Sequence, residues 1–73
     1  MQTPDPRILF GRQLRKLRLR SKLSQERLAE IADLHRNYVG GVERGERNVS
    51  LVNIVKLARA LKVKPGQLLR TIS

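Results

Sequence analysis

Hydrophobic residues recur along this chain at intervals of three and four positions, the spacing at which side chains share one face of an α-helix. In one segment the apolar stripe consists of Phe10, Leu14 and Leu17. No segment shows the strict alternation typical of a β-strand. The pattern therefore predicts five short helices and no strands, over residues 6–20, 25–32, 36–44, 51–61 and from 65 onward.

Capping residues mark where these helices begin and end. Asp5 followed by Pro6 forms an N-cap and first-turn pair, and Ser24 and Ser50 precede the second and fourth helices. Gly45 ends the third helix, because glycine readily takes the left-handed conformation found there. Tight connections between short helices predict a compact all-α fold.

The second and third predicted helices are separated only by residues 33–35. Two helices joined this closely and crossing at about 90–120° form a helix-turn-helix, whose second helix can enter the DNA major groove. Ala29 supplies the small residue needed at the crossing. Asp33 lies where the turn commonly needs a positive φ, which Asp tolerates better than most residues. His35 takes the N-cap position of the third helix, so we expect it to be structural.

The helix over residues 36–44 has two different sides. At 100° per residue, Tyr38, Val39 and Val42 lie on the inner side. The outer side carries Arg36, Asn37, Gly40, Gly41 and Arg44. Each glycine weakens a helix by about 1 kcal/mol relative to alanine. We predict that the pair allows the helix backbone to approach DNA closely, without reading a base through a side chain.

The charge of the chain points to a polyanionic partner. Sixteen Lys and Arg against six Asp and Glu give a formal net charge of +10, and seven of the basic residues lie between Arg7 and Lys22. The two aromatic residues, Phe10 and Tyr38, are too few for base-stacking platforms, which disfavours single-strand and RNA binding. Double-stranded DNA is the favoured partner. A cationic membrane-surface protein is a weaker alternative, because no helix joins a large apolar face to a fully basic one.

Length and residue usage set further limits. The 73 residues are expected to form one domain, residues 1–73, and the absence of cysteine excludes disulfides and thiolate metal sites and fits a reducing cytoplasm. No run approaches the roughly 18 apolar residues of a membrane span, and the N-terminus lacks an apolar signal region. We expect a cytoplasmic protein that is not an enzyme and uses no metal or cofactor.

Two stretches of the chain resemble the Cro and CI phage repressor family, also called the Xre family: LRKLRLRSKLSQERLAEIADLHRNYVGGVERGERN and SLVNIVKLARALKVKPGQLL. The resemblance spans residues 10–69. Within the family, LHRNYxxxxERGxRNxSL is most similar to the small controller proteins of restriction-modification systems. The resemblance implies a five-helix, lambda-repressor-like fold and a transcriptional regulator that binds double-stranded DNA.

The resemblance also implies roles for individual residues. Arg36 and Asn37 would read bases, in agreement with the bidentate pairing of Arg with guanine and Asn with adenine. Arg18 and Glu43 match positions that form a partly buried ion pair between the first and third helices. Tyr38 is expected to pack, with its hydroxyl able to reach a phosphate. Together with Tyr38, the implied DNA-backbone contacts are Gln25, Arg44, Arg47 and Asn48.

The chain departs from the family pattern at three informative positions. Gly41 stands where many relatives place a base-reading side chain, so we expect no readout there. Lys62 and Lys64 replace a C-terminal glycine and a Ser or Thr cap. The junction between the fourth and fifth helices should therefore be less well capped.

Few residues follow the last predicted helix, so we expect no ligand-sensing domain and no small-molecule effector. An autoregulated protein that responds to its own concentration fits this expectation. The alternative is an antitoxin, which would bind a toxin and use the same fold for autorepression.

A single recognition helix reads only a few base pairs, too few for the usual gap between specific and non-specific affinity. We therefore predict a symmetric homodimer on an operator with two inverted half-sites, about 34 Å apart. Four apolar residues exceed what a short terminal helix needs to cover its own core. The predicted interface consists of Val63, Leu68, Leu69 and Ile72.

Overall fold

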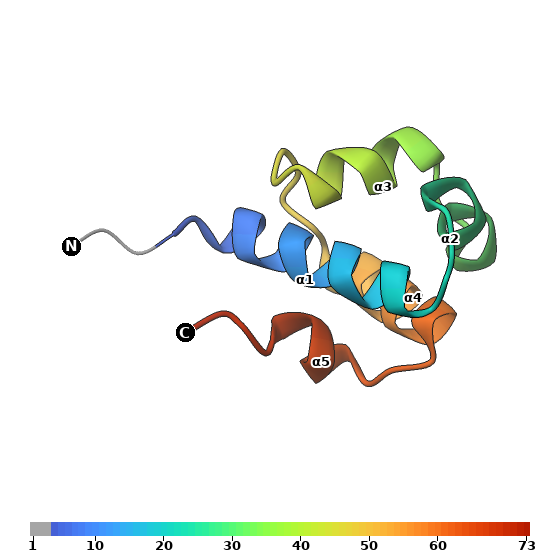
Figure 1. The fold of residues 1–73 in the computed structure, drawn as a ribbon. Helices are drawn as coiled ribbons and strands as arrows, with labels where there is room; N and C mark the ends of the chain where they lie inside the picture. Colours follow the sequence, from blue (N-terminus) through green and yellow to red (C-terminus); the bar gives the residue numbers. More distant parts are fainter. Residues whose placement is uncertain (1–3) are drawn as a thin grey trace.

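The computed structural model of the chain describes residues 4–73 and contains five α-helices (Figure 1). They are α1 (Pro6–Arg20), α2 (Gln25–Ala32), α3 (Arg36–Glu43), α4 (Leu51–Leu61) and α5 (Pro65–Leu69). The all-α fold class is confirmed, and α3 ends one residue earlier than predicted, with Arg44 as its C-cap. Among these helices, none is both long and apolar enough to cross a lipid bilayer.

The predicted caps form the expected hydrogen bonds. The side chain of Asp5 accepts from the backbone N–H of Arg7 at 2.8 Å, and the hydrogen bonds from Arg7 lower the pKa of Asp5 to about 2. Ser24 and Ser50 accept from the backbone N–H three residues on, at 2.9 and 3.2 Å. His35 caps α3 through Nδ1, which accepts a backbone N–H at 3.2 Å. Local chemistry therefore sets where α1 to α4 begin.

Left-handed residues end α2 and α4. Asp33 takes φ 57° at the end of α2, as predicted for the helix-turn-helix turn. Lys62 takes φ 59° at the end of α4, the conformation that a glycine would adopt more easily. Lys64 precedes α5 without a side-chain capping bond, so the junction is less well capped, as expected.

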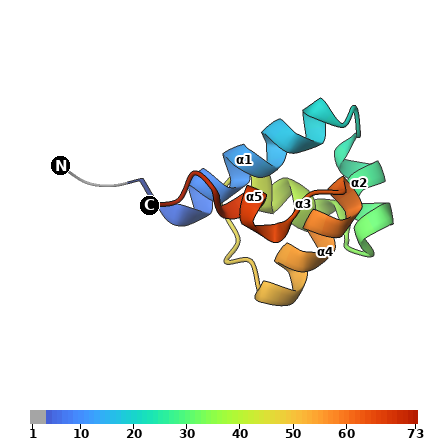
Figure 2. The same ribbon diagram turned by 90° about the horizontal axis from the view of Figure 1, so that it is seen from below.

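The helices enclose one apolar core. α1 packs against α3 and α5, and α2 packs against α3 and α4 (Figures 1 and 2). The core residues Leu14, Leu28, Val39 and Leu57 are fully buried where these helices meet. Because α1 and α2 cover only the inner side of α3, the opposite side faces outward at one edge of the molecule.

Two glycines bring the chain segments around α3 into close contact. A Cβ atom on Gly11 would overlap the carbonyl oxygen of Val42, so α1 lies directly against the end of α3. Gly45, at φ 77°, packs on Ile8, and a Cβ there would lie 2.7 Å from Ile8 Cγ1. This contact explains Ile8, which lies outside the apolar stripe of α1. Together the two contacts fix the C-terminal end of α3 on α1.

Candidate nucleic-acid interface

The outward side of α3 carries exposed arginines at both ends. Arg36 and Asn37 are exposed in the first turn, and Arg36 Nη1 lies 3.5 Å from Glu26 Oε2 on α2. Arg44 follows the last turn, where its Nε donates to Glu46 Oε2 at 2.9 Å and lowers the pKa of that carboxyl. Exposed pairs of this kind contribute little energy. Phosphates or base acceptors could therefore replace these carboxylates.

A groove of about 270 Å³ lies between the start of α2 and the outward side of α3. Its lining residues are Gln25, Glu26, Arg36, Asn37, Gly40 and Arg44. Four of the predicted DNA contacts thus meet in one concave surface. The sequence did not indicate Glu26 as part of this surface, because an acidic residue in the first turn of a helix is favoured by the helix dipole in any case.

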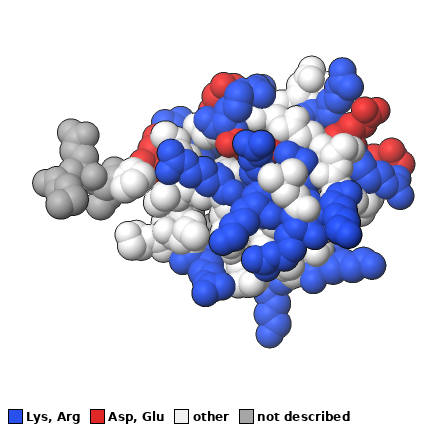
Figure 3. All heavy atoms as spheres, in the orientation of Figure 1, with Lys and Arg blue, Asp and Glu red and all other residues white. Residues whose placement is uncertain are grey.

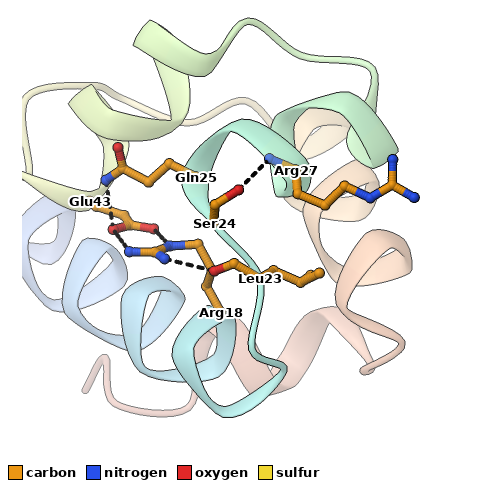
Figure 4. A network of polar contacts seen from close by, with 6 residues as sticks. All are labelled: Arg18, Leu23, Ser24, Gln25, Arg27 and Glu43. Carbon is orange, nitrogen blue, oxygen red and sulfur yellow. Dashed lines mark hydrogen bonds and ion pairs between the residues drawn. The ribbon is translucent and has the colours of Figure 1, made fainter.

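A buried polar network ties this groove to the core (Figure 4). Arg18 donates through Nε and Nη2 to the carboxylate of Glu43, at 2.6 and 3.0 Å, and through Nη1 to the carbonyl of Leu23 at 2.8 Å. Gln25 Nε2 donates to the same carboxylate at 3.0 Å. The hydrogen bond with Glu43 raises the pKa of Arg18, which therefore stays charged. The network holds α1, α2 and α3 in one arrangement and fixes Gln25 at the groove.

A second group of predicted DNA contacts lies beyond the end of α3. Arg47 and Asn48 are exposed, and the Arg47 guanidinium lies 6.0 Å from the centre of the Tyr38 ring. The Tyr38 hydroxyl accepts from Asn53 Nδ2 on α4 at 3.0 Å, which leaves its own proton free to donate. The sequence did not predict this role of Asn53, because the two residues are 15 positions apart and no local pattern indicates their contact.

The two adjacent glycines, predicted to let the helix backbone approach DNA closely, are buried. A Cβ on Gly40 would lie 3.1 Å from Arg44 Nη1 and 3.4 Å from Gln25 Oε1. A Cβ on Gly41 would lie 3.2 Å from Arg47 Nε. Both glycines do face away from the core, as predicted, but polar side chains cover them. Direct access of DNA to this backbone is therefore closed in this structure.

The four residues predicted for the dimer interface differ in how exposed they are. Leu68 is fully buried, because α5 packs it against the core between α1 and α4, so its assignment to an interface was wrong. Val63 and Ile72 are half-buried against the same core. Leu69 remains 41% exposed and borders a hollow of about 140 Å³. The apolar lining of this hollow includes Phe10, Val49, Ile54 and Ile72.

Positive charge extends well beyond α3. Figure 3 shows Lys and Arg spread across the visible face, with Asp and Glu confined to its upper half. The sequence explains this separation, because no acidic residue lies between Asp5 and Glu26 or after Glu46. The resulting field attracts polyanions toward the molecule from a distance.

A helix-turn-helix with an outward second helix, an adjoining polar groove and a strongly basic surface defines a class of DNA-binding regulators. The Helix-turn-helix family matches residues 14–68 of this chain. The chain therefore belongs to this family and is a DNA-binding transcriptional regulator.

Its relatives include control proteins. The chain is 53% identical to Control protein C.BamHI of Bacillus amyloliquefaciens over 68 residues, which covers 92% of this chain and 84% of that protein. It is 46% identical to Control protein C.SmaI of Serratia marcescens over 65 residues, covering 89% of this chain and 77% of that protein.

The solved structure of the restriction-modification controller protein C.AhdI from Aeromonas hydrophila matches the fold with a TM-score of 0.84. The two chains are 60% identical, and the match covers 85% of this chain and 94% of that one. The predicted resemblance to controller proteins is confirmed, and these relatives do not favour the antitoxin alternative.

Proposed function

We propose that α3 reads base edges in the major groove of duplex DNA through Arg36 and Asn37. The observation that carries this proposal is the groove in which these two exposed side chains meet Gln25 and Arg44. Arg can pair bidentately with guanine and Asn with adenine, which distinguishes base pairs in this groove. The proposed contacts to phosphates fix the register of α3 on the duplex. They come from Gln25, Tyr38, Arg44, Arg47 and Asn48.

We infer that the regulated genes include its own, within a restriction-modification system. The support is the similarity to proteins named as control and restriction-modification controller proteins. Transcription in vitro from the DNA upstream of the gene, with increasing amounts of the protein, tests this inference. An unchanged transcript level at every protein concentration would contradict autoregulation.

Substituting either of the two proposed base-reading residues should lower both the affinity for the cognate site and the preference for its bases. Arg36→Ala and Asn37→Ala are each expected to reduce binding to the cognate site by about 1–3 kcal/mol and to relax base preference at one position. Selection of duplexes from a random pool identifies the site, and titration against single-base variants measures the effect. The control is Arg27→Ala, which removes an exposed arginine of α2 outside the groove. Unchanged selectivity in both α3 variants would show that other residues read the bases.

We infer further that two copies pair about a two-fold axis and present their α3 helices to inverted half-sites. Of the four residues predicted for the interface, Leu69 is the one that remains exposed, and it borders the apolar hollow. A second copy seated on Leu69 would form an isologous contact, in which the same surface of each subunit pairs with itself. Two helices then supply the base contacts that one helix lacks.

Leu69→Glu should separate such a dimer without unfolding its subunits. The substitution places a charge in the proposed contact, yet the side chain is 41% exposed in one copy of the chain. We expect sedimentation at micromolar concentration to show a dimer for the wild type and a monomer for the variant. The control is Leu19→Glu, at a 53% exposed position on the outer face of α1. A monomeric wild type that protects a single half-site in footprinting would overturn the dimer.

A further inference from the structure

Arg47 lies along the surface of α3 over a position that has no side chain. Beyond the neighbouring residues and the backbone of α3 itself, the three heavy atoms closest to a Cβ at position 41 all belong to Arg47: Nε at 3.2 Å, Cγ at 3.3 Å and Cδ at 3.8 Å. An alanine here would have to push the arginine away or move it by a few tenths of an ångström. Arg47 therefore lies closer to α3 than it could beside an alanine at position 41.

The Tyr38 ring provides a second surface for the same arginine. The Arg47 guanidinium lies 6.0 Å from the ring centre, within the range of cation–π attraction. Asn53 holds the Tyr38 hydroxyl from α4 at 3.0 Å. Within residues 4–73, no carboxylate forms an ion pair with Arg47, whereas Arg44 is paired with Glu46. Arg47 thus lies against Gly41 and near the Tyr38 ring without a carboxylate in direct contact.

Gly40 has the same relation to the side chains that line the groove. A Cβ at this position would lie 3.1 Å from Arg44 Nη1 and 3.4 Å from Gln25 Oε1. Gln25 is itself held by Glu43 at 3.0 Å. Both glycines therefore have their outward surface occupied by residues that we assign to DNA-backbone contacts.

We propose that Gly40 and Gly41 are positioning residues. Because they lack Cβ atoms, they leave space in which the side chains of Arg44 and Arg47 lie along α3, placed for contact with phosphates. Each such space is called a seat below. This proposal rests on the DNA-binding face proposed above. Immobilising a long side chain on binding lowers affinity, and a seat that orders the side chain beforehand avoids part of that loss. The glycines thus act through the arginines and not through direct approach of the α3 backbone to DNA.

The effect of Gly41 on Arg47 can be tested without disturbing the fold. Neither glycine has a positive φ, since Gly45 is the glycine with that conformation among residues 4–73. A Cβ at position 41 meets a flexible side chain and no backbone atom among its three nearest neighbours. Alanine is also the better helix former. Gly41→Ala should therefore melt no lower than the wild type.

The deciding experiment is a double-mutant cycle with Gly41→Ala, Arg47→Ala and the two combined. We expect Gly41→Ala to weaken binding to a defined duplex about 2- to 10-fold, the loss for one newly immobilised side chain. In the Arg47→Ala background the same substitution should change nothing. Gly66→Ala is the matched control, because no atom beyond the adjacent residues and its own helix backbone lies within 4 Å of a Cβ at that helical position. The cycle of Gly40→Ala with Arg44→Ala repeats the test at the second seat.

Each outcome separates the seat from the wider proposal. Unchanged affinity in Gly41→Ala, or an equal loss with and without Arg47, would overturn the seat, and the equal loss would indicate direct contact of the α3 backbone with DNA. If Arg47→Ala itself binds like the wild type, its assignment as a DNA contact fails, and the seat fails with it. A loss in Arg47→Ala with none in Gly41→Ala would overturn the seat alone.

Nuclear magnetic resonance of the free protein gives a readout that does not involve DNA. The Tyr38 ring current should shift the side-chain protons of Arg47 upfield in the wild type and in Gly66→Ala. The shift should become smaller in Gly41→Ala. A folded Gly41→Ala protein that keeps the shift would contradict the seat.

Discussion

Replacing Glu43 with alanine should lower the free energy of unfolding by about 3–5 kcal/mol, because it leaves the buried guanidinium of Arg18 without its carboxylate. The side chains of Arg18 and Glu43 are only 9% and 3% exposed, so bulk solvent reaches the guanidinium poorly. Since each kcal/mol corresponds to at least about 4 °C for a domain of this size, the thermal midpoint should fall by at least about 12 °C. Circular dichroism during heating measures this change.

The control is Glu46→Ala, which removes a carboxylate from a pair whose side chains are 61% and 57% exposed. Exposed pairs contribute about 1 kcal/mol or less, so this variant should melt close to the wild type. Combining Glu43→Leu with Arg18→Met should recover much of the loss, because an apolar pair leaves no uncompensated charge. Equal midpoints for Glu43→Ala and Glu46→Ala would show that the buried pair does not stabilise the fold.

Binding to duplex DNA should weaken on the order of 10⁵-fold between 50 and 200 mM salt. The formal charge of +10 and its spread over the surface favour many phosphate contacts. With about five contacts in each subunit of a dimer, the slope of log affinity against log salt should approach about −9, since each contact contributes about −0.9. Titrations of the selected operator at several salt concentrations give the slope.

Two substitutions that each remove one positive charge distinguish direct phosphate contacts from the electrostatic field of the whole protein. Arg47→Ala should reduce the salt slope by about one unit for each subunit. Arg59→Ala removes the same charge from the exposed surface of α4, outside the proposed interface, and should leave the slope nearly unchanged. An affinity that stays flat between low and moderate salt would contradict the polyanion hypothesis itself.

The sequence was sufficient to predict the features that depend only on nearby residues. Helix periodicity and capping residues depend on neighbours within about four positions, so the limits of α1, α2 and α4 followed from the chain alone. Asp33 at the left-handed turn position was predictable for the same reason. The side of α3 that faces outward also followed from its periodicity, and the resemblance of the motif indicated the class of regulator.

The tertiary structure decided what covers each side chain, because that depends on residues distant in the sequence. The periodicity of α5 did not show that Leu68 would fill the space between α1 and α4, and Leu69 was left outside. The contact of Gly11 with the end of α3, and the bond from Asn53 to Tyr38, also required the packed helices.

The glycine pair shows the same division most directly. The sequence of α3 was enough to predict that both glycines point outward, since 100° per residue fixes the face on which each residue lies. Arg44 lies over Gly40 because residues four positions apart are neighbours on a helix. That Arg47 lies back over Gly41 was decided by the path of the chain after α3, which turns at Gly45. A local pattern determines where a residue points, whereas only the folded chain determines what it meets there.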